Sequence, residues 1–168
     1  MGRSGAEWDN CPSQCSYLQP YVGDYNGVFL GEFVHTLDSK GRLTIPAKFR
    51  AGLDASLVVT RGMDRCLAMF PIAEWEQLAA RVSDLPMTDR RARAFKRFLF
   101  SSASNVSPDK QGRVLIPPRL REYAGLDGEV VVAGLNDYIE IWSTDAWQAE
   151  RERVEGPDVD IEGLAALG

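Results

Sequence analysis

Apolar and polar residues follow a strand–turn–strand pattern that occurs twice along the chain. From Phe29 to Leu37 the larger apolar side chains favour one side of an extended backbone, which predicts a β-strand with one buried face. Residues 38–41 predict a turn, and alternation over residues 42–45 predicts a return strand. Residues 105–116 repeat the pattern, so we expect a second unit of the same kind.

Helical periodicity and short apolar runs account for most of the remaining residues, which together predict a mixed α/β fold of the α+β class. In the first unit we expect a short helix at 46–52, strands at 57–60 and 67–70, a helix at 72–82, and a second helix from Thr88 with Ala92, Phe95 and Leu99 facing the core. In the second unit we expect a short helix at 118–124, strands at 129–133 and 138–142, and a closing helix at 144–154.

The two units share more than their pattern. The first contains DSKGRLTIP from Asp38, and the second contains DKQGRVLIP from Asp109. Aspartate, glycine, arginine, isoleucine and proline recur in order with nothing inserted, and the basic residues of the following short helices recur as well. The chain therefore contains one module used twice.

These repeats suggest four segments. We expect modules at 28–104, which includes a helical hairpin, and at 105–155, followed by an acidic tail at 156–168. Residues 1–27 show no periodicity, so we expect a disordered leader. Val28 is an alternative initiator, in which case the leader is an artefact of the assigned start.

The charge distribution changes the picture that the net charge gives. The chain of 168 residues has a formal charge of −5, which argues against a nucleic-acid partner. Residues 28–53 and 105–126, however, each hold four basic residues against two acidic ones, whereas residues 148–168 hold six acidic residues and two basic ones. Each copy of the motif is a basic segment in an acidic chain.

Several function classes find no support in the sequence. No apolar run is long enough to cross a membrane, so we expect no membrane partner. The three cysteines, two of them at Cys11 and Cys15, fit free thiols of a reducing cytoplasm better than a disulfide framework or a zinc site. His35 with Asp38 is the one pair that suggests acid–base chemistry, but the second module has Val106 in place of the histidine. We expect no enzyme, no metal, no cofactor and no small-molecule substrate.

Arg42 and Arg113 are the main candidate site residues. A turn explains Asp38 and Asp109 as acceptors for backbone N–H groups and Gly41 and Gly112 as residues in the left-handed conformation, but it does not require an arginine afterwards. A solvated arginine is the simplest interpretation. The alternative, which we favour, is that each arginine projects from a hairpin tip, where its planar guanidinium group can contact DNA phosphates or the edge of guanine.

Other basic residues have weaker claims. Lys40 and Lys110 occupy different positions within the two turns, which suits non-specific contact with phosphates. The short helices carry Lys48 and Arg50 in one copy and Arg119 and Arg121 in the other, for which a solvated helix face is an equally good interpretation. The basic stripe at residues 90–97 is typical of the exposed side of an amphipathic helix.

From Val28 onward the chain resembles the MraZ family of bacterial transcriptional regulators. Residues 29–33 are similar to that family's N-terminus, and both Asp-x-x-x-Arg motifs are in register with the family's pair, one in each AbrB-like half. The strand at 138–142 and the helix containing Trp147 also match. The resemblance covers about five-sixths of the chain and excludes the leader.

The resemblance implies a fold, an assembly and a function. The fold would be a tandem of AbrB-like swapped-hairpin modules that pair within one chain, and several chains would form a ring-shaped homo-oligomer. The protein would bind short direct repeats in double-stranded promoter DNA upstream of the division and cell-wall gene cluster, its own promoter included, mostly as a repressor. It would reside in the cytoplasm on the nucleoid. The family role of arginine would fall to Arg42 and Arg113, and that of aspartate to Asp38 and Asp109.

Three hypotheses follow: a DNA-binding regulator, an oligomeric protein-interaction scaffold without specific DNA binding, and an enzyme, for which no residues present themselves. Under the first hypothesis Arg42→Ala abolishes DNA binding and leaves the oligomer intact. Under the second it breaks the assembly or a protein contact.

Overall fold

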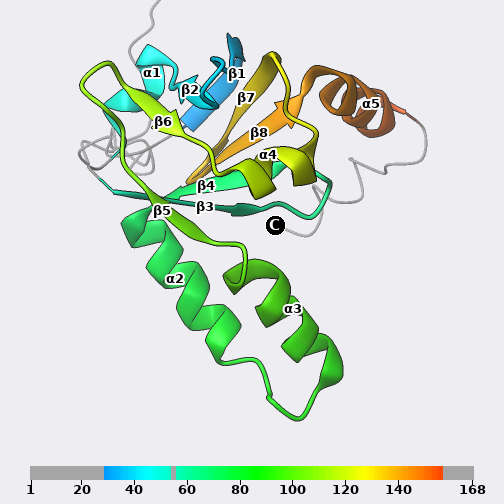
Figure 1. The fold of residues 1–168 in the computed structure, drawn as a ribbon. Helices are drawn as coiled ribbons and strands as arrows, with labels where there is room; N and C mark the ends of the chain where they lie inside the picture. The colour runs from blue at the N-terminus through cyan, green and yellow to red at the C-terminus, as the bar shows by residue number, and fades with distance from the viewer. Residues whose placement is uncertain (1–28, 54–55, 157–168) are drawn as a thin grey trace, which may run out of the picture.

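The computed structural model describes residues 29–53 and 56–156, so the leader and almost all of the acidic tail lie outside the described residues. Within these ranges the chain forms eight strands and five helices (Figure 1). The strands are β1 (Phe29–Thr36), β2 (Arg42–Thr44), β3 (Leu57–Arg61), β4 (Leu67–Pro71), β5 (Ser104–Val106), β6 (Arg113–Leu115), β7 (Glu129–Asn136) and β8 (Ile139–Ser143). The helices are α1 (Ala47–Arg50), α2 (Ile72–Ser83), α3 (Arg90–Phe100), α4 (Pro118–Ala124) and α5 (Thr144–Glu155). The predicted mixed α/β class is confirmed.

The strands form two antiparallel sheets. Six of them make a large sheet in the order β1-β7-β8-β4-β3-β5, and β2 pairs with β6 in a separate sheet of two strands. We call this small sheet the β2–β6 ribbon. It lies on one side of the large sheet, and the hairpin of α2 and α3 projects from the other side (Figure 1).

The two halves of the sequence exchange strands. β1 of the first copy pairs along its whole length with β7 of the second, from Phe29 opposite Asn136 to Thr36 opposite Glu129. Its counterpart β5 pairs with β3 of the first copy, and β2 pairs with its own counterpart β6. The swapped pairing within one chain that the family resemblance implies is therefore confirmed.

This exchange corrects the local hairpin that the strand–turn–strand pattern predicts. β1 and β2 meet only at the turn, where Leu37 bridges Leu43 and the Asp38 N–H donates to the Arg42 carbonyl at 3.0 Å. Beyond that point β1 joins the large sheet and β2 joins the ribbon. The two-stranded element is thus built from both copies, because the apolar face of each short strand is buried only when the other is present.

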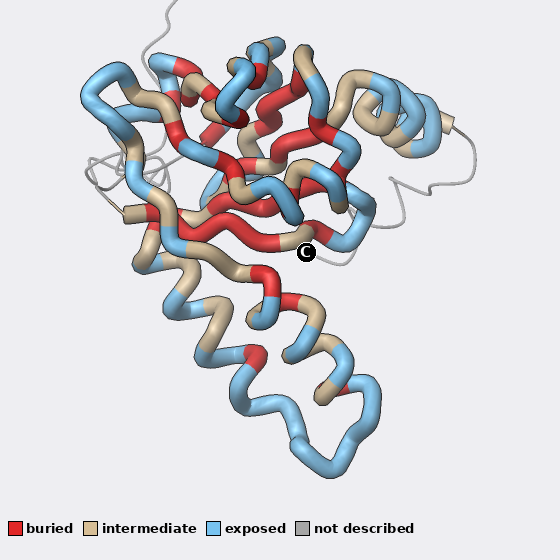
Figure 2. The backbone as a smooth tube through the Cα atoms, in the orientation of Figure 1, coloured by how far each residue is buried: buried red, intermediate tan, exposed pale blue. Residues whose placement is uncertain are grey.

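The core lies between the ribbon and the large sheet. The inward-facing residues Leu43, Ile45, Val114 and Ile116 are fully buried, as the alternation along the two return strands predicts. They pack in one cluster with residues of the large sheet and of α1 and α4: Phe29, Phe49, Leu57, Val59, Leu67, Met69, Leu120, Ala124, Val130, Val132, Ile139 and Ile141. Figure 2 shows that burial is concentrated in the strands, whereas the outer helices are largely exposed.

The helices outside this core have structural partners of their own. In the basic stripe, Lys96 Nζ donates to the carbonyls of Ser83 and Leu85 at 2.8 and 2.9 Å and so ties α3 to the end of α2. In α5, the Trp147 indole N–H donates to Glu32 Oε2 at 3.1 Å and joins the last helix to β1. The stripe lies on the helical hairpin, away from the ribbon.

Candidate nucleic-acid interface

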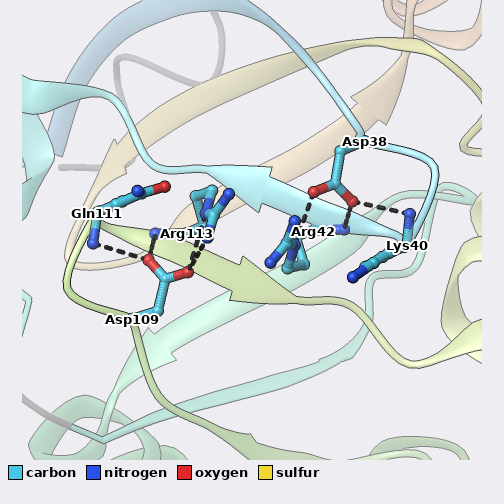
Figure 3. Close-up of polar contacts among 6 residues, drawn as sticks. All are labelled: Asp38, Lys40, Arg42, Asp109, Gln111 and Arg113. Carbon is cyan, nitrogen blue, oxygen red and sulfur yellow. Dashed lines mark hydrogen bonds and ion pairs between the residues drawn. The ribbon is translucent and has the colours of Figure 1, made fainter.

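The outer face of the β2–β6 ribbon carries Arg42 and Arg113, the equivalent arginines of the two copies of the motif. Arg42 lies opposite Leu115, and Thr44 lies opposite Arg113, so these four residues share the face that points away from the core. Figure 3 shows the two arginine side chains over the ribbon, with Asp38 and Asp109 towards opposite ends of it. The side chains of Arg42 and Arg113 keep 31% and 27% of their surface exposed.

Asp38 organises the first turn and fixes the arginine that follows it. Its Oδ1 accepts from the backbone N–H groups of Lys40 and Arg42, each at 2.9 Å, and its Oδ2 accepts from Arg42 Nε at 2.6 Å. The Arg42 backbone N–H, together with the guanidinium contact and the Lys40 N–H, lowers the pKa of Asp38, and these contacts outweigh the opposing effect of burial. The carboxylate engages the Nε side of Arg42, which leaves the end of the guanidinium directed away from the turn.

Asp109 makes the same contacts in the second turn. Its Oδ1 accepts from the N–H groups of Gln111 and Arg113 at 2.9 and 3.0 Å, and Oδ2 lies 2.8 Å from Arg113 Nε and 2.7 Å from its Nη2. The Arg113 side chain is the main reason that the pKa of Asp109 falls to about 2. The repeat therefore produces two nearly equivalent Asp–Arg units related by an approximate two-fold axis through the ribbon.

Two further arginines join this surface, each from the other copy. Gly41 and Gly112 have φ values of +78° and +72°, which favour glycine, and a Cβ atom on Gly41 would lie 2.5 Å from Arg121 Cζ. A Cβ atom on Gly112 would lie 2.6 Å from Arg50 Nε. The backbone conformation thus favours glycine at both positions, and a larger residue there would also displace the arginine that lies over it.

Arg50 and Arg121 are fixed in these positions by backbone contacts. Arg50 Nε donates to the Ile45 carbonyl at 3.0 Å, and Arg121 Nε donates to the Ile116 carbonyl at 3.1 Å. From the sequence, a DNA contact and a solvated helix face are equally good interpretations of these two arginines. The structure places their side chains against the turns of the opposite copy. Both arginines recur at the same offset from the motif, and this recurrence is the sequence signal that could have identified them.

The lysines lie at the ends of the ribbon. Lys40 precedes β2 and Lys110 precedes β6, and the antiparallel pairing places these turns at opposite ends. The expectation that the arginines project from hairpin tips is wrong, since Arg42 and Arg113 lie within the paired strands. The ribbon surface therefore has arginines at its centre and a lysine at each end.

The hypotheses of an acid–base pair, a metal site and a membrane-spanning helix find no support in the described residues. His35 is half-buried, and burial together with the charge of Arg50 lowers its pKa, while Asp38 is engaged by its own turn. Residues 29–53 and 56–156 contain no group of three or more potential metal-ligating side chains. In the same ranges no helix is long and apolar enough to cross a membrane.

The Asp109 turn predicts a pH dependence of stability. Its pKa of about 2 in the folded chain lies below the ordinary value of 3.8, so the charged carboxylate stabilises the fold above about pH 4, and this contribution is lost as the pH falls from about 5 to 2. We expect Asp109→Asn to lower the melting temperature at pH 7, and the difference from wild type to shrink over that interval. Calorimetry of both proteins between pH 7 and 2 measures this difference in melting temperature. A difference that stays constant down to pH 2 would contradict the role of the charge.

Comparison with known proteins identifies the family. A family model described as "MraZ protein, putative antitoxin-like" matches the chain twice, over residues 28–98 and 99–156. The chain belongs to the MraZ family. The resemblance inferred from the Asp-x-x-x-Arg motifs is confirmed.

Comparison with individual proteins supports the same family. A protein named "Transcriptional regulator MraZ" from Thermomicrobium roseum is 49% identical over 142 residues, which are 83% of this chain and 99% of the relative. Proteins of the same name from Herpetosiphon aurantiacus and Roseiflexus castenholzii are 52% and 54% identical over 121 residues, 72% of this chain and 85% of each relative. MraZ relatives are thus named as transcriptional regulators, and the chain is a member of a family of such regulators.

Proposed function

We propose that this MraZ-family protein is a sequence-specific DNA-binding transcriptional regulator that contacts double-stranded DNA through the outer face of the β2–β6 ribbon. The observation that carries the proposal is that two equivalent carboxylates hold Arg42 and Arg113 on the same outer face of the ribbon. A two-stranded ribbon is narrow enough to enter the major groove, and arginine is the side chain best suited to the O6 and N7 atoms of guanine.

The electrostatics of the ribbon support the proposal. The ribbon and its turns hold more basic side chains than acidic ones: Arg42, Arg113, Arg50, Arg121 and the two turn lysines against two aspartates. Each aspartate already accepts from N–H groups of its own turn through Oδ1 and from its arginine through Oδ2. The carboxylates therefore orient the arginines and do not cancel the positive surface. Lys40 and Lys110, at the ends, would contact phosphates on either side of the groove.

The finer assignment follows the family resemblance. We propose that the protein forms a ring-shaped homo-oligomer on the nucleoid in the cytoplasm and binds short direct repeats upstream of the division and cell-wall gene cluster, including its own promoter, mostly as a repressor. One ribbon provides few cations, so a single contact would be weak, and several ribbons on one ring would gain affinity through effective concentration.

The test is a gel shift on the DNA upstream of the protein's own coding region. We expect a complex that survives non-specific competitor, weakens steeply with added salt, and is at least tenfold weaker on a duplex with one repeat than on one with several. Equal affinity for one repeat and for several would contradict the multivalent mechanism. Absence of any complex at low salt would overturn the proposed function.

A scaffold without specific DNA binding is the second candidate. Leu30 and Val34, each 61% exposed, lie on the edge strand β1 and suit contact with another protein. Under this alternative Arg42→Ala changes the mass of the assembly, whereas under the proposed function it changes DNA binding at constant mass. Light scattering on the variant distinguishes the two.

A further inference from the structure

One apolar side chain lies on the face of the ribbon that carries the arginines. Leu115 is 56% exposed, although it belongs to the paired part of β6 between two fully buried neighbours, Val114 and Ile116. Its partner across the ribbon is Arg42, and Arg113 lies two residues before it on the same face. Leu115 therefore stands among the groups that the proposed function brings to DNA.

The fold does not explain a leucine at this position. The inner face of the ribbon, not the outer one, supplies the core, and the equivalent position in the first copy is the polar residue Thr44. Single exposed apolar residues are common and mean little by themselves. Leu115, however, shares its face with both motif arginines, so it would meet the bases of a major groove that the ribbon enters.

The chemistry of the major groove supplies that partner. Thymine presents its C5-methyl group there, and it is the apolar group that distinguishes an A·T pair from the others. For a ribbon lying along the groove, the two-residue step from Arg113 to Leu115 spans roughly 6.6 to 6.8 Å. This is close to two base-pair steps of about 3.4 Å each. A leucine at this distance from an arginine can contact a thymine while the arginine contacts a base or phosphate nearby.

We propose that Leu115 is a specificity residue that contacts the methyl group of a thymine in the bound DNA. This inference rests on the proposed function and adds the class of base that one side chain recognises. Thr44, with a single methyl group and a hydroxyl, offers a different contact at the symmetry-related position. The two ends of the ribbon would then prefer different bases.

The experiment removes the methyl group from the DNA and leaves base pairing unchanged. The duplex upstream of the coding region is prepared once with thymidine and once with deoxyuridine, and the affinities of the full-length protein for both are compared. We expect wild type to bind the deoxyuridine duplex about fourfold more weakly for each contact, equivalent to about 0.8 kcal/mol for one buried methyl group. Leu115→Ala should bind both duplexes with a ratio near one.

Matched variants separate this effect from a change in the fold or in the DNA. Met87→Ala truncates another exposed apolar side chain, exposed to 64% in the connection between α2 and α3, and should keep the wild-type ratio. Leu115→Thr introduces the residue of the first module and should keep part of the preference for the thymidine duplex. Melting temperature and assembly mass should match wild type in all three variants, because the truncated side chains are exposed.

Each outcome decides the proposal. Loss of the thymine preference in Leu115→Ala, with the preference retained in Met87→Ala, supports it. Equal binding of the two duplexes by wild type, or a preference that persists unchanged in Leu115→Ala, overturns it and leaves the proposed function standing. If wild type binds neither duplex, the proposed function fails and this inference fails with it.

Discussion

Arg42→Ala combined with Arg113→Ala is expected to reduce specific DNA binding by about 30-fold or more without unfolding the protein. A well-placed arginine–guanine contact contributes about 1–3 kcal/mol, or about 5- to 150-fold in affinity, and the double variant removes both guanidinium groups from every ribbon. The fold should survive because both side chains lie on the outer face of the ribbon and contribute nothing to the apolar core, and ion pairs at the protein surface contribute only modestly to stability. Titration of the upstream duplex, with circular dichroism and assembly mass, measures both properties.

Two control variants sharpen this result. Arg153→Ala on α5 breaks an exposed ion pair of the same kind, with Glu150 at 2.9 Å, and removes one positive charge away from the ribbon, so it should bind nearly as wild type. Arg42→Lys keeps the charge but loses the planar fork, so it should keep binding to random DNA and lose sequence preference. Equal losses in Arg153→Ala and in the single variant Arg42→Ala would show that only net charge matters.

Cutting the chain between the two modules is expected to abolish folding of either half as a monomer. A fragment of residues 28–103 would lose the partners of β1 and β2, and a fragment of residues 104–168 would lose those of β5, β6 and β7. Each half would also expose its share of the core cluster, including Leu43 and Ile45 or Val114 and Ile116. Burying one such side chain contributes about 2–3 kcal/mol, so the loss of the whole cluster exceeds the stability of a small domain.

The fragments themselves provide the measurement. We expect each one alone, at micromolar concentration, to lack a cooperative thermal transition as a monomer, and an equimolar mixture to regain sheet structure and DNA binding. Because the halves are related by a repeat, a fragment can also pair with a second copy of itself, and its folding would then depend on concentration. A folded monomer of either fragment in sedimentation would contradict the exchanged architecture.

Local sequence information predicted the elements better than their pairing. Alternation along β2 and β6 placed Leu43 and Val114 inside and the arginines outside, because side-chain direction in a strand depends only on position. The choice of β6 as the partner of β2 depends on contacts between residues about 70 positions apart, which no short pattern contains. Only the family resemblance indicated that exchange.

The candidate site shows the same division. The Asp38 and Asp109 turns were predictable from residue chemistry, since a carboxylate and a glycine at this spacing form a self-contained turn. The contacts of Arg50 and Arg121 with the turns of the opposite copy were not, because each follows from the packing of α1 or α4 beside a ribbon made from both modules.

The approximate two-fold axis of the ribbon gives the protein a polarity that an ordinary homodimer lacks. Two identical subunits present identical halves to DNA, and their natural operator is a palindrome. Here the halves lie in one chain and differ. One turn holds Ser39 and Lys40 and the other holds Lys110 and Gln111, and Thr44 occupies at one end of the ribbon the position that Leu115 occupies at the other. Substitutions can therefore accumulate at one end alone, and the cognate sequence can be directional, so that successive sites face the same way along the double helix.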